Sequence, residues 1–142
     1  MNKKLLIGIL VALLLVLVLG FLLKAPQEVI VTTEKTEYGL GEAPTMTIRN
    51  NLASNFCISS CYPYYLEKNN GEWKSYLYEE CKEPDLVEMC IESNQTKSLE
   101  LIISATDSGL HRIAVPSCVN CQVGEKFEEN ERFYSNEFTI GR

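Results

Sequence analysis

Six cysteines are the residues of this 142-residue chain whose type and spacing are best suited to chemistry. Cysteine thiolates can form disulfides, coordinate a metal ion, or react with other thiols and disulfides. Four of them form two close pairs, separated by three and by two residues, and the other two lie between these pairs. The close pairs are Cys57 and Cys61, and Cys118 and Cys121. The two cysteines between them are Cys81 and Cys90.

Disulfides are the chemistry that an even number of cysteines favours in an oxidising compartment. Six cysteines allow 15 different sets of three bonds. Cys81 and Cys90 enclose only eight residues, so Cys81–Cys90 is the pairing that the sequence favours. The other four cysteines pair either within Cys57-x3-Cys61 and Cys118-x2-Cys121, or across between these two segments.

Two alternatives remain open for the cysteines. Four thiolates converging from two loops would make a closed tetrahedral zinc site, with Cys57, Cys61, Cys118 and Cys121 as ligands and zinc as the cofactor. Cys118-Val-Asn-Cys121 also has the Cys-x-x-Cys spacing of thiol redox motifs. Without zinc, no cofactor is expected.

The compartment follows from residues 5–23, which carry no charged or hydrogen-bonding side chain. Nineteen residues of helix span roughly 28 Å, close to the thickness of a bilayer's hydrocarbon core. The run is longer than that of a typical secretory leader, and Lys24 and Pro26 follow it in place of a cleavage site. We therefore expect an uncleaved signal anchor that places this chain in the cytoplasmic (inner) membrane.

Charge gives the orientation of this single-pass protein. Lys3 and Lys4 precede the apolar run, which predicts an N-terminus inside (residues 1–4) and a C-terminal domain outside. Beyond Lys24 the chain has ten basic and 19 acidic residues, a net charge of −9. Nucleic acid is not expected as a partner, because binding it requires a basic surface. The expected partners are the lipid bilayer, through residues 5–23, and a protein outside the membrane.

Residues 29–141 form the outer domain, joined to the membrane helix by a short linker, 24–28. No window keeps a helical period of apolar residues, whereas short runs of strand composition alternate with turns. An all-β fold of about seven strands is predicted, with Asn70-Gly71 as a hairpin turn. The predicted strands are residues 28–33, 45–50, 62–68, 72–78, 97–104, 109–115 and 132–140.

Alternating apolar residues define the expected core of a two-layer sandwich. They are Met46, Ile48, Leu99, Leu101, Ile103, Ile113, Val115, Phe138 and Ile140, whereas Trp73, Tyr64, Tyr76 and Tyr78 are expected to pack rather than to form a ligand cage. The long loops, 79–96 and 116–131, carry cysteines and acids. Alternating strand directions bring all six cysteines to the membrane-side end of the sandwich.

Short motifs in this order resemble a known family, the small immunoglobulin-like β-sandwich domains of prokaryotic exported proteins. They are Tyr38-Gly-Leu-Gly-Glu42, Arg49-Asn50, Gly71-Glu72-Trp73, Ser108-Gly-Leu-His-Arg-Ile113 and Ser135-Asn-Glu-Phe-Thr-Ile140. The resemblance implies an antiparallel immunoglobulin-like sandwich. His111 departs from it, since the family has a tyrosine there. Such relatives are accessory, adhesive or interaction modules, and a related sandwich occurs among proteinase inhibitors.

Catalytic residues are not predicted anywhere in the chain. His111 is the only histidine, and the motifs of hydrolases and of phosphate-binding loops are missing from the sequence. Asn94-Gln95-Thr96 is a glycosylation acceptor triplet if the host glycosylates. The predicted function is therefore non-enzymatic: a disulfide-stabilised interaction or structural module of the cell envelope. The alternatives are a thiol redox or zinc protein, and a proteinase-inhibitor-like module.

Overall fold

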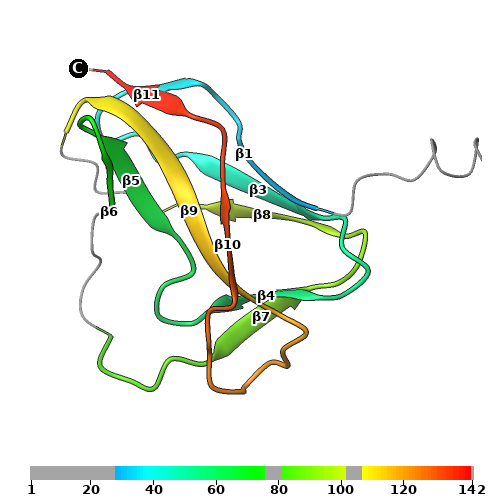
Figure 1. The fold of residues 1–142 in the computed structure, drawn as a ribbon. Helices are drawn as coiled ribbons and strands as arrows, with labels where there is room; N and C mark the ends of the chain where they lie inside the picture. The colour runs from blue at the N-terminus through cyan, green and yellow to red at the C-terminus, as the bar shows by residue number, and fades with distance from the viewer. Residues whose placement is uncertain (1–27, 76–80, 102–106, 142) are drawn as a thin grey trace, which may run out of the picture.

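The described part of the chain is built of β-strands alone (Figure 1). The computed structural model describes residues 28–75, 81–101 and 107–141. Its eleven strands are β1 (Val29–Thr33), β2 (Glu37–Tyr38), β3 (Thr45–Asn50), β4 (Phe56–Ser59), β5 (Tyr65–Asn69), β6 (Trp73–Ser75), β7 (Val87–Ile91), β8 (Thr96–Glu100), β9 (Gly109–Val119), β10 (Glu131–Tyr134) and β11 (Phe138–Ile140).

These strands form two sheets. One is antiparallel, in the order β1-β3-β8. The other follows the path β2-β11-β9-β4-β7, with β10 and the hairpin β5-β6 also pairing along β9. Its pairs are antiparallel except β2 with β11, which run parallel. The prediction of an all-β fold is confirmed, and the second sheet is mixed rather than purely antiparallel.

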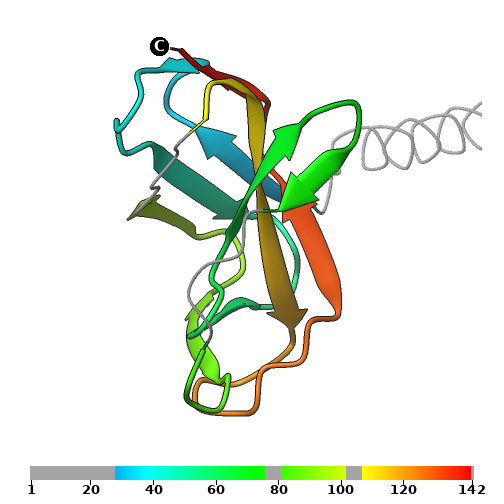
Figure 2. The ribbon, with the colours of Figure 1, turned by 90° about the vertical axis from the view of Figure 1, so that its left-hand side faces the viewer.

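Strand β9 organises the second sheet because, with eleven residues, it is longer than every strand that pairs with it (Figure 2). Its first half lies between β11 and β5, and its second half between β10 and β4. Each half therefore hydrogen-bonds to a different pair of strands. The second half carries Cys118 into register with Cys57 of β4.

One apolar core lies between the sheets. Met46 and Ile48 come from the first sheet, and Ile113, Val115 and Phe138 come from the second. Fully burying one side chain of this size stabilises a fold by roughly 1.5–3 kcal/mol. Among the predicted core residues, Leu99 is half-buried and packs against the core, and Ile103 lies outside the described residues. The other predicted core residues are buried, as expected.

Asn50 is the last residue of β3, at the end of the strand nearest the cysteines. Its side chain is fully buried, and its amide group donates to the carbonyl oxygens of Ser54 and Ile91, both at 2.8 Å. Its Oδ1 accepts a hydrogen bond from the backbone N–H of Leu52 at 3.0 Å. Every polar group of this side chain is thus satisfied, as burial requires. Asn50 joins β3 to the end of β7, the strand that carries Cys90.

The strand boundaries differ from the prediction in two ways. The predicted run 132–140 divides into β10 and β11, because Ser135 and Asn136 bond other segments. Three strands were missed, β2, β4 and β7, and the predicted loops contain β7 and the end of β9. The described residues therefore form eleven strands, whereas about seven were predicted. Cys57, Cys90 and Cys118 lie in strands and not in loops.

Helices with the length and hydropathy needed to cross a bilayer are not found in the described ranges. The predicted start 1–4, the apolar run 5–23 and residues 24–27 of the linker lie outside these ranges, as do Tyr76 and Tyr78.

His111 generates a prediction on the pH dependence of stability. Its side chain is 1 % exposed, and burial lowers its pKa below the ordinary value, although its Nδ1 donates to the Gly109 carbonyl oxygen at 2.9 Å. The folded protein therefore takes up this proton at a lower pH than the unfolded chain, in which the imidazole is protonated below pH ~6.5. Stability should fall as the pH drops below ~6.5, by at most about 1.4 kcal/mol per pH unit.

Chemical denaturation at several pH values between 7.5 and 5 checks this. His111→Gln removes the titration while keeping an amide donor for the Gly109 carbonyl. The difference in stability between wild type and His111→Gln should shift against the wild type as the pH falls. A difference that stays constant over this range would contradict a buried neutral imidazole.

Candidate functional site

The six cysteines form three disulfides at one end of the fold. They join Cys57 to Cys90, Cys61 to Cys81, and Cys118 to Cys121. The expectation of disulfides is met, and so is the expectation that all six cysteines gather at one end, around β4. The favoured pair Cys81–Cys90 is wrong. A bond between Cys118 and Cys121 was one of the pairings left open by the sequence. Cys57 and Cys61 do not bond to each other or to Cys118 and Cys121, but to Cys90 and Cys81 of the 79–96 segment.

The register of β4 and β7 explains the corrected pairing. Cys57 and Cys90 lie directly opposite each other on neighbouring antiparallel strands, with their Cα atoms 4.0 Å apart. Side chains opposed in this way point to the same face of the sheet. Strand β7 therefore takes Cys90 away from Cys81, although only eight residues separate them in the chain.

A buried hydroxyl positions the second disulfide. Ser59, at the end of β4, accepts hydrogen bonds from the backbone N–H groups of Cys61 and Tyr62, at 3.0 and 2.8 Å. It donates to Oδ1 of Asp85 at 2.6 Å. The Tyr62 hydroxyl in turn accepts from the backbone N–H of Cys81 at 3.0 Å. These contacts bring the segment after β4 and the segment before β7 together at Cys61–Cys81.

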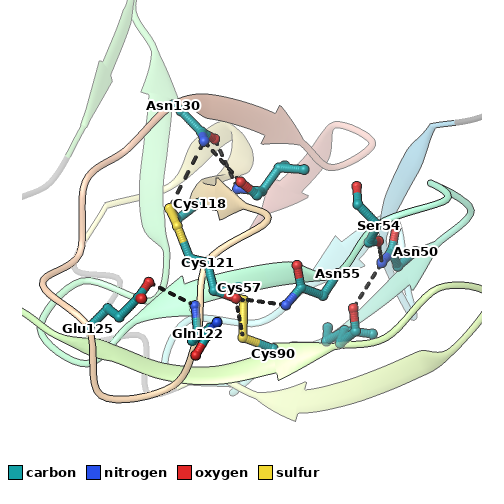
Figure 3. Close-up of a disulfide and its surroundings, with 12 residues drawn as sticks. Asn50, Ser54, Asn55, Cys57, Cys90, Cys118, Cys121, Gln122, Glu125 and Asn130 are labelled. Atoms are coloured by element: carbon teal, nitrogen blue, oxygen red, sulfur yellow. Dashed lines mark hydrogen bonds between the residues drawn. A yellow bond between two sulfur atoms is a disulfide. The ribbon is translucent and has the colours of Figure 1, made fainter.

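The third disulfide closes the turn that follows β9 (Figure 3). Asn120 has a φ of 65°, in the left-handed region that most residues avoid but asparagine tolerates. The Cys121 carbonyl oxygen accepts a hydrogen bond from Nδ2 of Asn55 at 2.7 Å, and Cys57 Sγ lies 3.4 Å from the same oxygen. The disulfides Cys57–Cys90 and Cys118–Cys121 are therefore in contact.

The predicted zinc ligands are divided among the three disulfides. Cys61 bonds to Cys81, outside the predicted set of four, and no group of three or more potential metal-ligating side chains occurs within the described ranges. Oxidised sulfur does not supply the thiolate that zinc binds. A zinc site would thus require a reduced protein.

Asn94 lies in the turn between β7 and β8, where its side chain is exposed. Its φ is 62°, and its Nδ2 donates to the Ser93 hydroxyl at 3.0 Å. The position is open to solvent, and glycosylation there stays a prediction.

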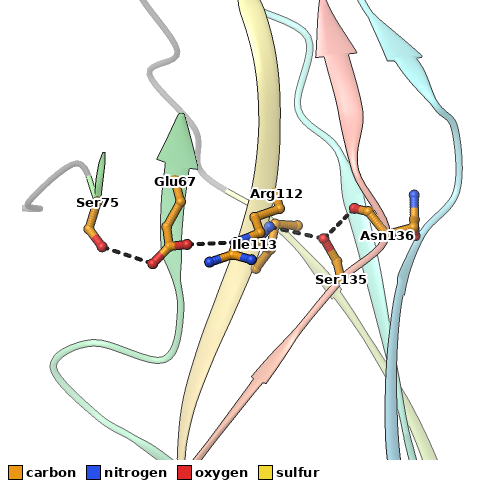
Figure 4. A network of polar contacts seen from close by, with 6 residues as sticks. All are labelled: Glu67, Ser75, Arg112, Ile113, Ser135 and Asn136. Atoms are coloured by element: carbon orange, nitrogen blue, oxygen red, sulfur yellow. Dashed lines mark hydrogen bonds and ion pairs between the residues drawn. The ribbon is translucent and has the colours of Figure 1, made fainter. Parts of the chain in front are cut away.

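A cluster that sequence reasoning missed lies on the outer face of the second sheet. The Arg112 guanidinium stacks between the rings of Trp73 and Tyr134, 4.2 and 3.9 Å from their centroids. Its Nε donates to Glu67 at 2.7 Å, and Glu67 also accepts from Ser75 (Figure 4). The only signal in the sequence is the alternation that puts Arg112 on the opposite face from Ile113. Trp73 packs on this cation, and Tyr64 is buried, as expected.

Removing Arg112 should leave the buried Glu67 carboxylate without its cation. In a double-mutant cycle of Glu67→Gln and Arg112→Met, we expect a coupling of about 1–3 kcal/mol, measured by denaturant unfolding. The matched control is the exposed pair Lys126–Glu128, whose charges are solvated. Its coupling, from Lys126→Met and Glu128→Gln, should stay below about 0.5 kcal/mol. Equal couplings for the two pairs would be inconsistent with the role given to burial.

The disulfides should contribute to stability in the order of the loops that they close. The sequence separations are 33 for Cys57–Cys90, 20 for Cys61–Cys81 and 3 for Cys118–Cys121. Chain entropy then predicts losses of about 3.7, 3.3 and 1.6 kcal/mol when each pair is replaced by serines. Urea unfolding without reductant measures the three losses. If the replacement of Cys118 and Cys121 caused the largest loss of stability, the predicted order of the three disulfides would be refuted.

Comparisons with known proteins give one structural likeness to report. No family model matches the chain, and no curated protein matches its sequence. A solved structure of the alkylpurine DNA glycosylase AlkC of Pseudomonas fluorescens, bound to DNA containing an abasic site analogue, is similar over 83 % of this chain, at 14 % identity and a TM-score of 0.38. The match covers 32 % of the glycosylase chain, so this chain spans about a third of that protein. At this level of similarity the likeness carries no argument on function.

Proposed function

We propose that this protein is a membrane-anchored, extracytoplasmic module of the cell envelope that acts in binding or in structure rather than in catalysis. The observation that carries the proposal is the pairing of all six cysteines as disulfides. Structural disulfides persist mainly outside the cytosol, where thiols are not kept reduced. This fits a domain held outside the membrane by residues 5–23, with Lys3 and Lys4 inside.

An immunoglobulin-like sandwich is the finer fold that we propose. In that fold the first, second and fifth strands share one sheet, and the third, sixth and seventh share the other. The order β1-β3-β8 matches the first set, and β5, β9 and the pair β10 and β11 match the second. The departure concerns β7, which holds the place of the fourth strand but pairs with β4.

The position of the first described residue supports a cysteine-rich end that faces the membrane. The Glu28 carbonyl oxygen accepts a hydrogen bond from the Asn51 N–H at 3.0 Å. Next to Asn51, the Asn50 side chain bonds the carbonyl of Ile91, the neighbour of Cys90. The chain thus enters the domain beside β7. Three disulfides near the anchor would stiffen the base of the domain, while the C-terminal end points away.

Labelling of lysines on intact cells tests the anchor and its orientation. The full chain is produced in a bacterial host, the outer envelope is opened, and a membrane-impermeant amine reagent is added before and after lysis. Lys126, whose side chain is 78 % exposed, should be labelled before lysis, whereas Lys3 and Lys4 should react only after it. Lys126→Arg is the control for peptide assignment. Labelled Lys3 and Lys4 with a protected Lys126, or a chain released from the membrane, would overturn the proposal.

A thiol redox function is the second candidate, and it is favoured by the contact between two disulfides. The Cys118–Cys121 pair has the spacing of redox motifs, and Cys121 is partly exposed. The purified outer domain would then reduce an added disulfide in the presence of a thiol donor, and Cys118→Ser would abolish the reaction. Zinc binding by the reduced protein is the third candidate function, and metal analysis after reduction tests it.

A further inference from the structure

Three cysteines form one row across three neighbouring strands. Cys57 of β4 lies directly opposite Cys90 of β7 on one side and directly opposite Cys118 of β9 on the other. All three side chains therefore point to the same face of the sheet. Directly opposed residues have Cα atoms roughly 4.5–5.5 Å apart, and disulfides bridge Cα separations of about 4.4–6.8 Å. The register thus offers Cys57 two partners, of which the structure uses Cys90.

The third cysteine of this row, Cys118, belongs to a second disulfide. Cys118 is bonded to Cys121, just after β9. The Cys121 carbonyl oxygen lies 3.4 Å from Cys57 Sγ and 3.8 Å from Cys90 Sγ, so the two disulfides pack against each other. Exposure differs between these residues: Cys57 and Cys118 are 0 % and 3 % exposed, whereas Cys121 and Cys90 are both partly exposed. A thiol from solvent therefore meets Cys121 before Cys118 or Cys57.

Polar groups beside the row suit the thiols and thiolates of an exchange reaction. Nδ2 of Asn130 lies 4.0 Å from Cys118 Sγ, and its amide is held in place by two hydrogen bonds to the backbone of Val119. An amide N–H directed at sulfur favours the thiolate form. The Cys121 carbonyl, near Cys90 Sγ, can accept a hydrogen bond from a Cys90 thiol.

We propose that the two disulfides exchange, so that an external thiol that attacks Cys121 finally frees Cys90 and Cys121. In the first step the external thiolate bonds to Cys121 Sγ, the Cys118–Cys121 bond breaks, and Cys118 leaves as a thiolate. In the second step Cys118 Sγ attacks Cys57 Sγ, the Cys57–Cys90 bond breaks, and Cys90 leaves as a thiolate and takes up a proton. Cys57–Cys118 is the new bond.

A second external thiol completes the reaction by attacking the sulfur of the first external thiol in the mixed disulfide, and Cys121 leaves as a thiolate that takes up a proton. Two external thiols are oxidised to one disulfide, and the protein gains two electrons and two protons as the thiols of Cys90 and Cys121. The link between β4 and β7 is thereby replaced by a link between β4 and β9. The redox state of the three row cysteines thus decides which strand is bonded to β4. This inference does not depend on the membrane anchor.

Paired variants test whether Cys57 and Cys118 can bond. Cys90→Ser with Cys121→Ser leaves Cys57 and Cys118 as the row cysteines, and we expect them to form a disulfide on oxidation. The matched control, Cys57→Ser with Cys121→Ser, leaves Cys90 and Cys118. These flank β4 at two strand spacings, about 9.6 Å, beyond the reach of a disulfide. The control should keep two free thiols. Two free thiols in both variants would overturn the proposal.

Wild-type protein gives an independent test that needs no substitution. It is treated with a limiting monothiol, such as glutathione, quenched by alkylation, and digested with trypsin. Before exchange, peptide 50–68 is bonded to both 75–82 and 83–97, and peptide 113–126 holds Cys118–Cys121 internally. Exchange should release 83–97 alkylated at Cys90 and join 113–126 to 50–68. A two-thiol species that contains only alkylated 113–126, with 83–97 still bonded, would contradict the exchange.

Discussion

Continuous pairing along β9 holds the strands of the second sheet in their places. Its eleven residues, Gly109–Val119, meet β11 and β5 at one end and β10 and β4 at the other. The inward residues Ile113 and Val115 belong to the core, while Arg112, on the other face, stacks between two aromatic rings. One strand thus links the apolar core, the outer face and the cysteine-rich end.

Register, rather than distance along the chain, decides the cysteine pairs. The second half of β9 sets Cys118 opposite Cys57, and β7 sets Cys90 opposite the same residue. Cross-strand partners are within bonding distance once the sheet has formed, whatever the length of the loop between them. The cost of closing that loop grows only slowly with its length. This is why Cys90 bonds to Cys57 rather than to its neighbour in sequence, Cys81.

Alternation in the sequence predicted the parts of the fold that bury one face of a strand. Met46 and Ile48 in β3, and Phe138 and Ile140 in β11, were assigned to the core correctly. Asn70-Gly71 was correctly placed in the turn between β5 and β6, where Gly71 has φ 93°. These elements follow from local periodicity and turn chemistry.

Strands β4 and β7 could not be found in this way. All four residues of β4 are buried, so Phe56–Ser59 shows no alternation, and cysteines made the segment resemble a loop. In β7 the adjacent residues Met89 and Cys90 are both partly buried. The disulfide pattern depends on the pairing of these two short strands. Arg112 was missed for a different reason: its aromatic neighbours, Trp73 and Tyr134, come from strands distant in sequence.

Mass spectrometry of the purified, unreduced chain can determine whether the six cysteines form the three disulfides that the register of the strands requires. The mass should increase by six hydrogens on full reduction, without bound zinc. Peptides 75–82 and 83–97 should both be bonded to 50–68, and Cys118 should be bonded to Cys121 within 113–126. A Cys81–Cys90 bond between 75–82 and 83–97, or four free thiols with one zinc ion, would contradict this pairing.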